Sequence, residues 1–177
     1  MINFPKSRIA SVLLASTALA ATATALTVAP AAAAASPKAS SAYSASTASS
    51  VRVVSPTSYA ARLVTLTNQA RAKAGLPALS TSSCLPPVAT RWAGSMAKSQ
   101  QMTHQSLDNL AAACPGWRTV GENIAKGNVS ADVLFTAWMN SPEHKANILR
   151  SKFNQQSVAV VRDSKGFYWV SVEFALR

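Results

Sequence analysis

Few residues in this chain of 177 could do chemistry. There are two histidines, His104 and His144, and six acidic residues, among them Glu122 and Glu143. Imidazoles and carboxylates can act as general acids or bases, and two imidazoles with water can hold a zinc ion. None of these residues has the spacing of a local metal motif such as H-E-x-x-H. Any shared site must therefore be assembled by the fold.

Each candidate also has a purely structural interpretation. In the stretch SPEHKANIL, Ser141 is a good N-cap, Pro142 suits the first helical position, and Glu143 meets the positive end of the helix dipole. His104 would favourably oppose the dipole at a helix C-terminus. Glu122, in a turn-like stretch between glycines, could be a solvated loop residue. His144 has no comparable structural explanation.

The spacing of apolar residues predicts four helices before a change of period. They cover residues 59–74, residues 88–104, residues 131–140 and a short segment that begins at Ser141. His104 is thus expected at the C-terminal end of the second helix.

The C-terminal part reads as a β-hairpin. Its two β-rich runs are residues 158–161 and 167–175, with a turn between them. Alternation in the second run places Trp169, Ser171 and Glu173 on one face. Helices followed by an antiparallel hairpin predict an α+β or layered sandwich fold rather than a wound parallel sheet.

The N-terminal part predicts export. Lys6 and Arg8 precede a long apolar run and a series of small residues, so residues 1–35 are interpreted as a secretory signal peptide, with an uncleaved membrane anchor as the alternative. Residues 36–55 are Ser/Ala-rich and predict a disordered spacer. Residues 56–177 suit one domain.

Charge favours anionic partners. The chain has 17 basic and six acidic residues, a net charge of +11. Such a charge favours cell-wall polymers, acidic lipid headgroups or nucleic acid. The basic residues are scattered, with no run interleaved with aromatic residues, so specific nucleic-acid binding is not expected. A monomer that adheres to an anionic envelope is the prediction.

The two cysteines, Cys84 and Cys114, predict a disulfide, because an even cysteine count in an exported protein suggests pairing. The alternative is a metal site with two cysteine ligands. That alternative lacks the short C-x-x-C spacing.

Several motifs together resemble a known family. They are NQAR at residues 68–71, MTH at 102–104, GENIAKG at 121–127, AWMNSPEHKANIL at 137–149 and YWVSVEFA at 168–175. In this order they resemble the bacterial branch of the CAP superfamily, the group of cysteine-rich secretory proteins, antigen 5 and plant pathogenesis-related proteins. The resemblance covers nearly all of residues 59–175.

The resemblance implies a fold and a site. The fold is a three-layer α-β-α sandwich with a central antiparallel sheet of three or four strands. The site is a cleft with two histidines and two acids, which correspond here to His104, His144 and Glu122, with Glu143 as the candidate second acid. The two histidines would be the ligands of a metal such as zinc, and the carboxylates would orient water. With two protein ligands alone, the metal is expected to be weakly bound or absent.

Two positions depart from the family pattern, and two others are structural candidates. Phe167 stands where many bacterial members have a further histidine, and Glu143 stands where glycine is common. Asn68 and Arg71 lie one helical turn apart and are expected to tie the first helix to neighbouring loops.

Three functions from different classes stay open. The first is a secreted binding module for a lipid-like or cell-envelope ligand, supported by the lack of a nucleophile motif such as G-x-S-x-G. The second is a hydrolase or protease in which a histidine activates water, directly or through a metal, with Glu122 as base. The third is a non-catalytic surface or host-interaction protein that acts through its basic surface.

Overall fold

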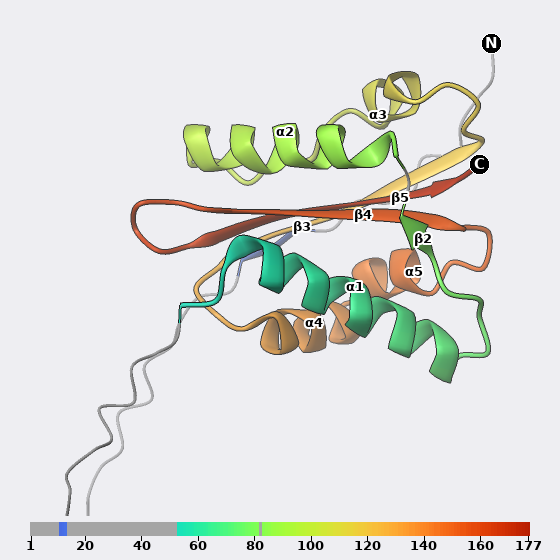
Figure 1. The fold of residues 1–177 in the computed structure, drawn as a ribbon, viewed down its shortest axis with the longest axis horizontal. Coiled ribbons are helices and arrows are strands. Elements are labelled where there is room, and N and C mark those ends of the chain that lie inside the picture. Colours follow the sequence, from blue (N-terminus) through green and yellow to red (C-terminus); the bar gives the residue numbers. More distant parts are fainter. Residues whose placement is uncertain (1–10, 14–52, 82) are drawn as a thin grey trace, which may run out of the picture. The chain divides into compact units, whose positions relative to one another are not determined.

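The computed structural model describes residues 11–13, 53–81 and 83–177 (Figure 1). Apart from residues 11–13 and 53–55, the predicted signal peptide and spacer lie outside the described residues. Among the residues that are described, no helix is both long and apolar enough to cross a membrane.

The centre of the fold is an antiparallel sheet of three strands. β3 (Thr119–Gly127) and β4 (Gln155–Arg162) both pair with β5 (Tyr168–Leu176). Two short strands add parallel pairings at the edges, β1 (Ser11–Leu13) on β3 and β2 (Ser80–Thr81) on β4. The described sheet therefore has the order β1-β3-β5-β4-β2, with parallel edges that the sequence analysis did not predict.

Helices cover both faces of the sheet, which confirms the predicted α-β-α arrangement (Figure 1). On one face lie α1 (Pro56–Lys73), α4 (Ala131–Asn140) and α5 (Pro142–Ile148). On the other face lie α2 (Leu85–Ser99) and α3 (Leu107–Ala113). α1, α4 and α5 each follow a serine N-cap and have a proline or an acidic residue in the first turn, which suits helix starts.

Three details differ from the prediction. The second helix ends at Ser99, because Gln100 adopts a left-handed conformation with φ of 57°, so His104 lies in the segment between α2 and α3 rather than at a helix end. α3 was not predicted. Glu122 lies inside β3 and not in a turn. Gly121 and Gly127 belong to the same strand, which pairs with β5 along its whole length.

The two faces of the sheet are packed differently. The α1 face holds the largest apolar cluster, which includes Leu63, Trp138 and Phe174. On the α2 face the clusters are smaller, and Ala89 and Ala93 of α2 pack directly on Ala159 of β4. These small side chains let the helix approach the strand closely.

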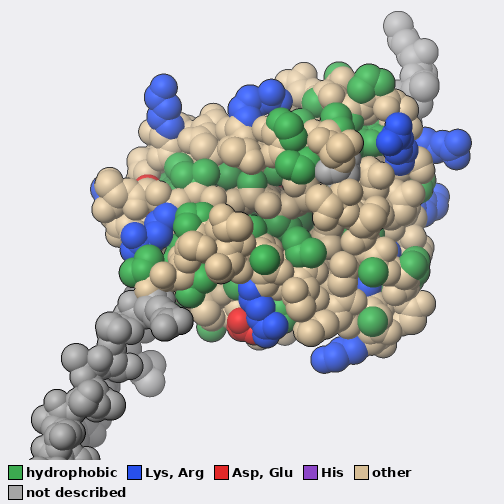
Figure 2. Space-filling view, viewed as in Figure 1, with side chains coloured by type: hydrophobic (Ala, Val, Ile, Leu, Met, Phe, Trp, Pro, Cys, Tyr) green, Lys and Arg blue, Asp and Glu red, His purple; other side chains and the backbone are tan. Residues whose placement is uncertain are grey.

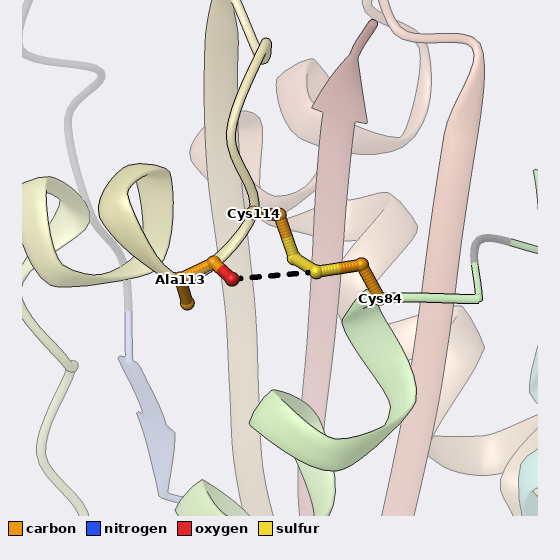
Figure 3. Close-up of a disulfide and its surroundings, with 3 residues drawn as sticks. All are labelled: Cys84, Ala113 and Cys114. Atoms are coloured by element: carbon orange, nitrogen blue, oxygen red, sulfur yellow. Dashed lines mark hydrogen bonds between the residues drawn. A yellow bond between two sulfur atoms is a disulfide. The ribbon is translucent and has the colours of Figure 1, made fainter.

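A disulfide between Cys84 and Cys114 confirms the predicted pairing. Figure 3 shows Cys84 at the start of α2 and Cys114 just after α3, beside Ala113. The bridge spans 30 residues of sequence. It therefore closes the segment that carries His104.

Candidate functional site

Two buried acids lie side by side on the central strands. In the antiparallel register Glu122 of β3 is directly opposite Glu173 of β5. Directly opposite residues share one face of a sheet, with Cβ atoms about 5 Å apart. Both side chains face the α2–α3 side, where the segment that links these helices contacts them. Their exposed fractions are 2% and 0%.

His104 and Gln105 bind this pair of acids from the linking segment. His104 Nδ1 lies 2.6 Å from Glu122 Oε1, and the backbone N–H of Gln105 donates to the same oxygen. The Gln105 side-chain amide donates to Glu122 Oε2 and to Glu173 Oε1, at 2.8 Å in each case. One amide group thus bridges carboxylates on two neighbouring strands.

Glu173 is the most deeply buried member of this network. Ser171 Oγ donates to Glu173 Oε1 at 2.7 Å, whereas Oε2 is buried and has no hydrogen-bond partner among the described residues. Burial, and then the negative charge of Glu122, raise the pKa of Glu173 well above its ordinary value, against the opposite effect of the bonds from Ser171 and Gln105. The Glu173 carboxyl therefore holds its proton to a higher pH than an ordinary glutamate does.

A partly exposed apolar cluster adjoins this polar network. Trp92 donates its indole N–H to the carbonyl of Thr103, the residue before His104. The buried centre of the cluster consists of Met96, Ile124 and Trp169. The half-exposed residues that pack against this centre are Trp92, Ala97, Met102 and Phe167.

A cation borders the same cluster. Lys126 Nζ lies 5.1 Å from the ring centre of Phe167 and 4.3 Å from that of Trp169. Ile124 and Lys126 follow Glu122 at alternate positions of β3, so all three share one face of the sheet. The His104 side chain is 14% exposed, whereas that of Glu122 is fully buried. His104 is therefore the member of the network within reach of a ligand.

His144 belongs to a different environment. It opens α5, on the opposite face of the sheet from α2 and α3 (Figure 1). Its Nδ1 lies 2.8 Å from Ser141 Oγ, and its ring stacks on that of Trp138 with 5.9 Å between ring centres. The Asn123 side chain, which points away from Glu122, donates to the His144 carbonyl.

The predicted metal site does not gather a third ligand. Within residues 11–13, 53–81 and 83–177, no group of three or more His, Cys, Asp and Glu side chains is placed to hold a metal ion. Catalytic zinc commonly has three protein ligands. A zinc site made by His104 and His144 alone stays a prediction, and the binding proposed below does not depend on it.

Glu143 is not the acid next to Glu122. It is half-exposed in the first turn of α5, whereas the acid directly opposite Glu122 is Glu173 of β5. Alternation along the strand places Glu173 on a face with Trp169 and Ser171, but Glu173 was not among the predicted site residues. Its position as a glutamate in a largely apolar strand could have marked Glu173 as a site residue. Nothing in the sequence marks Gln105 as one, apart from its position next to His104.

Asn68 and Arg71 make contacts that hold loops in place. The Asn68 side chain exchanges two hydrogen bonds with the backbone of Leu79. Arg71 is fully buried and donates to four carbonyl groups, those of Pro77, Ile148, Arg150 and Phe153. The carbonyls of Ile148 and Arg150 come from the end of α5, so Arg71 fixes that helix.

Comparison with known proteins now decides the family. The model of the cysteine-rich secretory protein family, CAP, matches residues 64–174, which is more than half of the chain. The chain belongs to the CAP family. A relative from Bacillus subtilis, the uncharacterized protein YkwD, is 33% identical over 121 residues. That alignment covers 65% of this chain and 46% of YkwD, so the CAP chain spans about half the length of this relative.

Solved structures of bacterial proteins share the fold. An outer surface protein from Borrelia burgdorferi has a TM-score of 0.65 at 19% identity, over 70% of this chain and 96% of that protein. A cysteine-rich secretory protein from Staphylococcus aureus has a TM-score of 0.61 at 25% identity, over 71% of this chain and 40% of that protein. The CAP chain therefore has the architecture of bacterial CAP domains.

Proposed function

We propose that this CAP protein is a secreted binding module whose His104 site binds a lipid-like ligand of the cell envelope. The observation that carries the proposal is the position of His104. Its partly exposed imidazole is held by buried Glu122 beside half-exposed Trp92, Met102 and Phe167. A fixed polar group next to an apolar surface suits a ligand that has both a polar head and an apolar chain.

The charge near this surface favours an anionic headgroup. Lys126 lies over two aromatic rings of the cluster, and the chain as a whole has a net charge of +11. A basic surface attracts anionic lipids and cell-wall polymers. Names of relatives such as outer surface protein and cysteine-rich secretory protein agree with a location outside the cell.

Binding of a fluorescently labelled long-chain fatty acid tests the proposal. We expect Trp92→Ala and His104→Ala each to weaken binding about tenfold, which corresponds to about 1.4 kcal/mol. Val133→Ala is the matched control, because Val133 is an exposed apolar residue of α4 on the other side of the sheet. Unchanged binding by both site variants, or equal loss in the control, would show that the site is not the binding site.

A hydrolase is the second candidate, and one observation favours it. The 2.6 Å contact between His104 and Glu122 orients the imidazole, as a general base requires. Both cysteines are joined in the disulfide, so neither thiol is free to act as a nucleophile, and this candidate uses water activated by His104. Hydrolysis of ester or peptide substrates that Glu122→Gln abolishes, while ligand binding persists, would favour this candidate over the binding module.

A further inference from the structure

The sheet has an open edge along β4. β2 pairs only with Gln155 and Gln156. Among the described parts of the chain, no strand pairs with the outer side of residues 157–162. This edge lies on the β4 side of the sheet, whereas the His104 site lies over β3 and β5.

Backbone groups of alternate residues point outward along this edge. Residues of an antiparallel strand alternate between those bonded to the partner and those that point away. The N–H of Asp163 donates to the carbonyl of Phe167 across the hairpin, which sets the phase. Ala159 and Val161 therefore bond to β5, and the N–H and C=O groups of Val158 and Val160 point outward.

The side chains along the edge are apolar. Val158, Val160 and Val161 are half-exposed, and Ala159 is buried under α2. Figure 2 shows hydrophobic side chains in a band across the middle of this face, at the level where Figure 1 shows β4 between α1 and α2.

This edge lacks the usual protection against pairing. Natural edge strands are commonly interrupted by proline, a bulge or inward-pointing charges. Here residues 157–162 contain no proline, the register with β5 is unbroken, and the one charged residue, Arg162, stands at the end. A regular, apolar edge of this kind can accept an added strand.

Positive charge lies at the hairpin end of the edge. Arg162 and Lys165 are exposed there. Gln100, which follows α2, donates to Asp163, so the end of α2 with exposed Lys98 reaches the same place. Asp163 is the one acid of the hairpin turn and is held by the indole N–H of Trp169. Three cations against one anion favour an acidic group on whatever binds.

We propose that the open edge of β4 binds an extended peptide segment of a partner protein, which adds as a further strand. The segment has apolar side chains at alternate positions and an acidic residue beside Arg162. A second copy of this chain is a poorer occupant, because its edge is flanked by the same positive charges and each chain has a net charge of +11.

A labelled peptide of alternating valine and threonine that ends in two aspartates tests this inference on the full chain. We expect Val160→Pro to weaken binding at least tenfold, because proline removes an outward N–H that β5 does not use. Val160→Thr keeps the N–H and a β-branched side chain, so it should bind like the wild type. Circular dichroism and thermal unfolding check that both variants fold.

Charge reversal gives a second test that does not depend on the proline variant. Arg162→Glu should weaken binding of the aspartate peptide and strengthen binding of the same peptide ending in two lysines. His104→Ala should bind the aspartate peptide normally, so failure of this inference is distinguishable from failure of the proposed function.

Three outcomes would overturn the inference. They are equal binding by folded Val160→Pro and the wild type, equal loss in Val160→Thr, and no effect of Arg162→Glu on either peptide. Sedimentation of the wild type as a dimer that Val160→Pro dissociates would instead identify a second copy as the occupant, and would also contradict the proposal.

Discussion

The two faces of the sheet both bury polar side chains, but they satisfy them in different ways. On the α1–α5 face, Arg71, Asn68 and Asn147 bond mainly to backbone groups. On the α2–α3 face, the network of His104, Gln105, Glu122, Ser171 and Glu173 consists mainly of bonds between side chains.

This difference separates a structural role from a functional one. Backbone carbonyls cannot change their charge, so the bonds from Arg71 and Asn68 that hold the loops and α5 have acceptors that do not titrate. Carboxylates and an imidazole can gain or lose protons, so the second face can respond to pH and to a ligand.

Arg71→Met should have the largest effect on stability. It leaves four carbonyl groups without their donor. The bonds to Ile148 and Phe153 are buried, and an unsatisfied buried group costs about 1 to 3 kcal/mol. We expect the free energy of unfolding, measured by urea denaturation, to fall by about 4 kcal/mol or more. Lys73→Met, an exposed change in the same helix, should alter it by less than about 0.5 kcal/mol. Similar small losses in both variants would contradict the structural role of Arg71.

Loss of the disulfide should weaken the α2–α3 face selectively. The double variant Cys84→Ser, Cys114→Ser removes a disulfide that links residues 30 positions apart. On the chain-entropy estimate, a disulfide that closes a loop of this length stabilises the fold by about 3 to 4 kcal/mol. Native-state hydrogen exchange should show faster exchange in α3 and the His104 segment than in α5. Uniform acceleration in all helices would show that the two faces are not separable in this way.

Glycine-to-alanine changes on the two faces should have opposite signs. A Cβ at Gly121 would lie 2.9 Å from Phe153 Cζ and 3.1 Å from Asn147 Oδ1, whereas nothing lies within 4 Å of a Cβ at Gly94. Gly121→Ala should therefore cost about 1 to 3 kcal/mol. Gly94→Ala, within α2, should stabilise by about 0.5 to 1 kcal/mol. Thermal unfolding of both variants measures the difference, and equal signs would contradict the tight packing at Gly121.

Glu173 should make stability depend on pH. Its folded-state pKa lies above the unfolded value, so the folded chain keeps a proton that the unfolded chain has lost. This group's contribution is therefore most favourable at acidic pH and declines as the pH rises from about 4.5 toward the folded-state pKa. One such proton gives a slope of at most about 1.4 kcal/mol per pH unit. Glu173→Gln should remove the decline and be relatively more stable at neutral pH. An unchanged slope in denaturation series at several pH values would show that Glu173 does not carry the proton.

Much of the fold could be predicted because its signals are local. Helical spacing indicates the helix that begins near Tyr59, and alternation indicates the hairpin of β4 and β5. β3 was missed because its sequence TVGENIAKG contains two glycines and two charged residues and resembles a turn. Long-range pairing with β5 makes it a strand, and such pairing is not visible in a short window of sequence.

The family, the layered fold, the disulfide and the candidacy of His104 and Glu122 could be predicted from the chain, because each depends on residue type and spacing. Three features become visible only in the folded molecule: Glu173 and Gln105 complete the acidic network, His144 lies with Trp138 on the other face, and β4 has an open edge. These features depend on strand order and register. Both are set by packing between segments far apart in the sequence, such as Gln105 and Glu173, which are 68 residues apart.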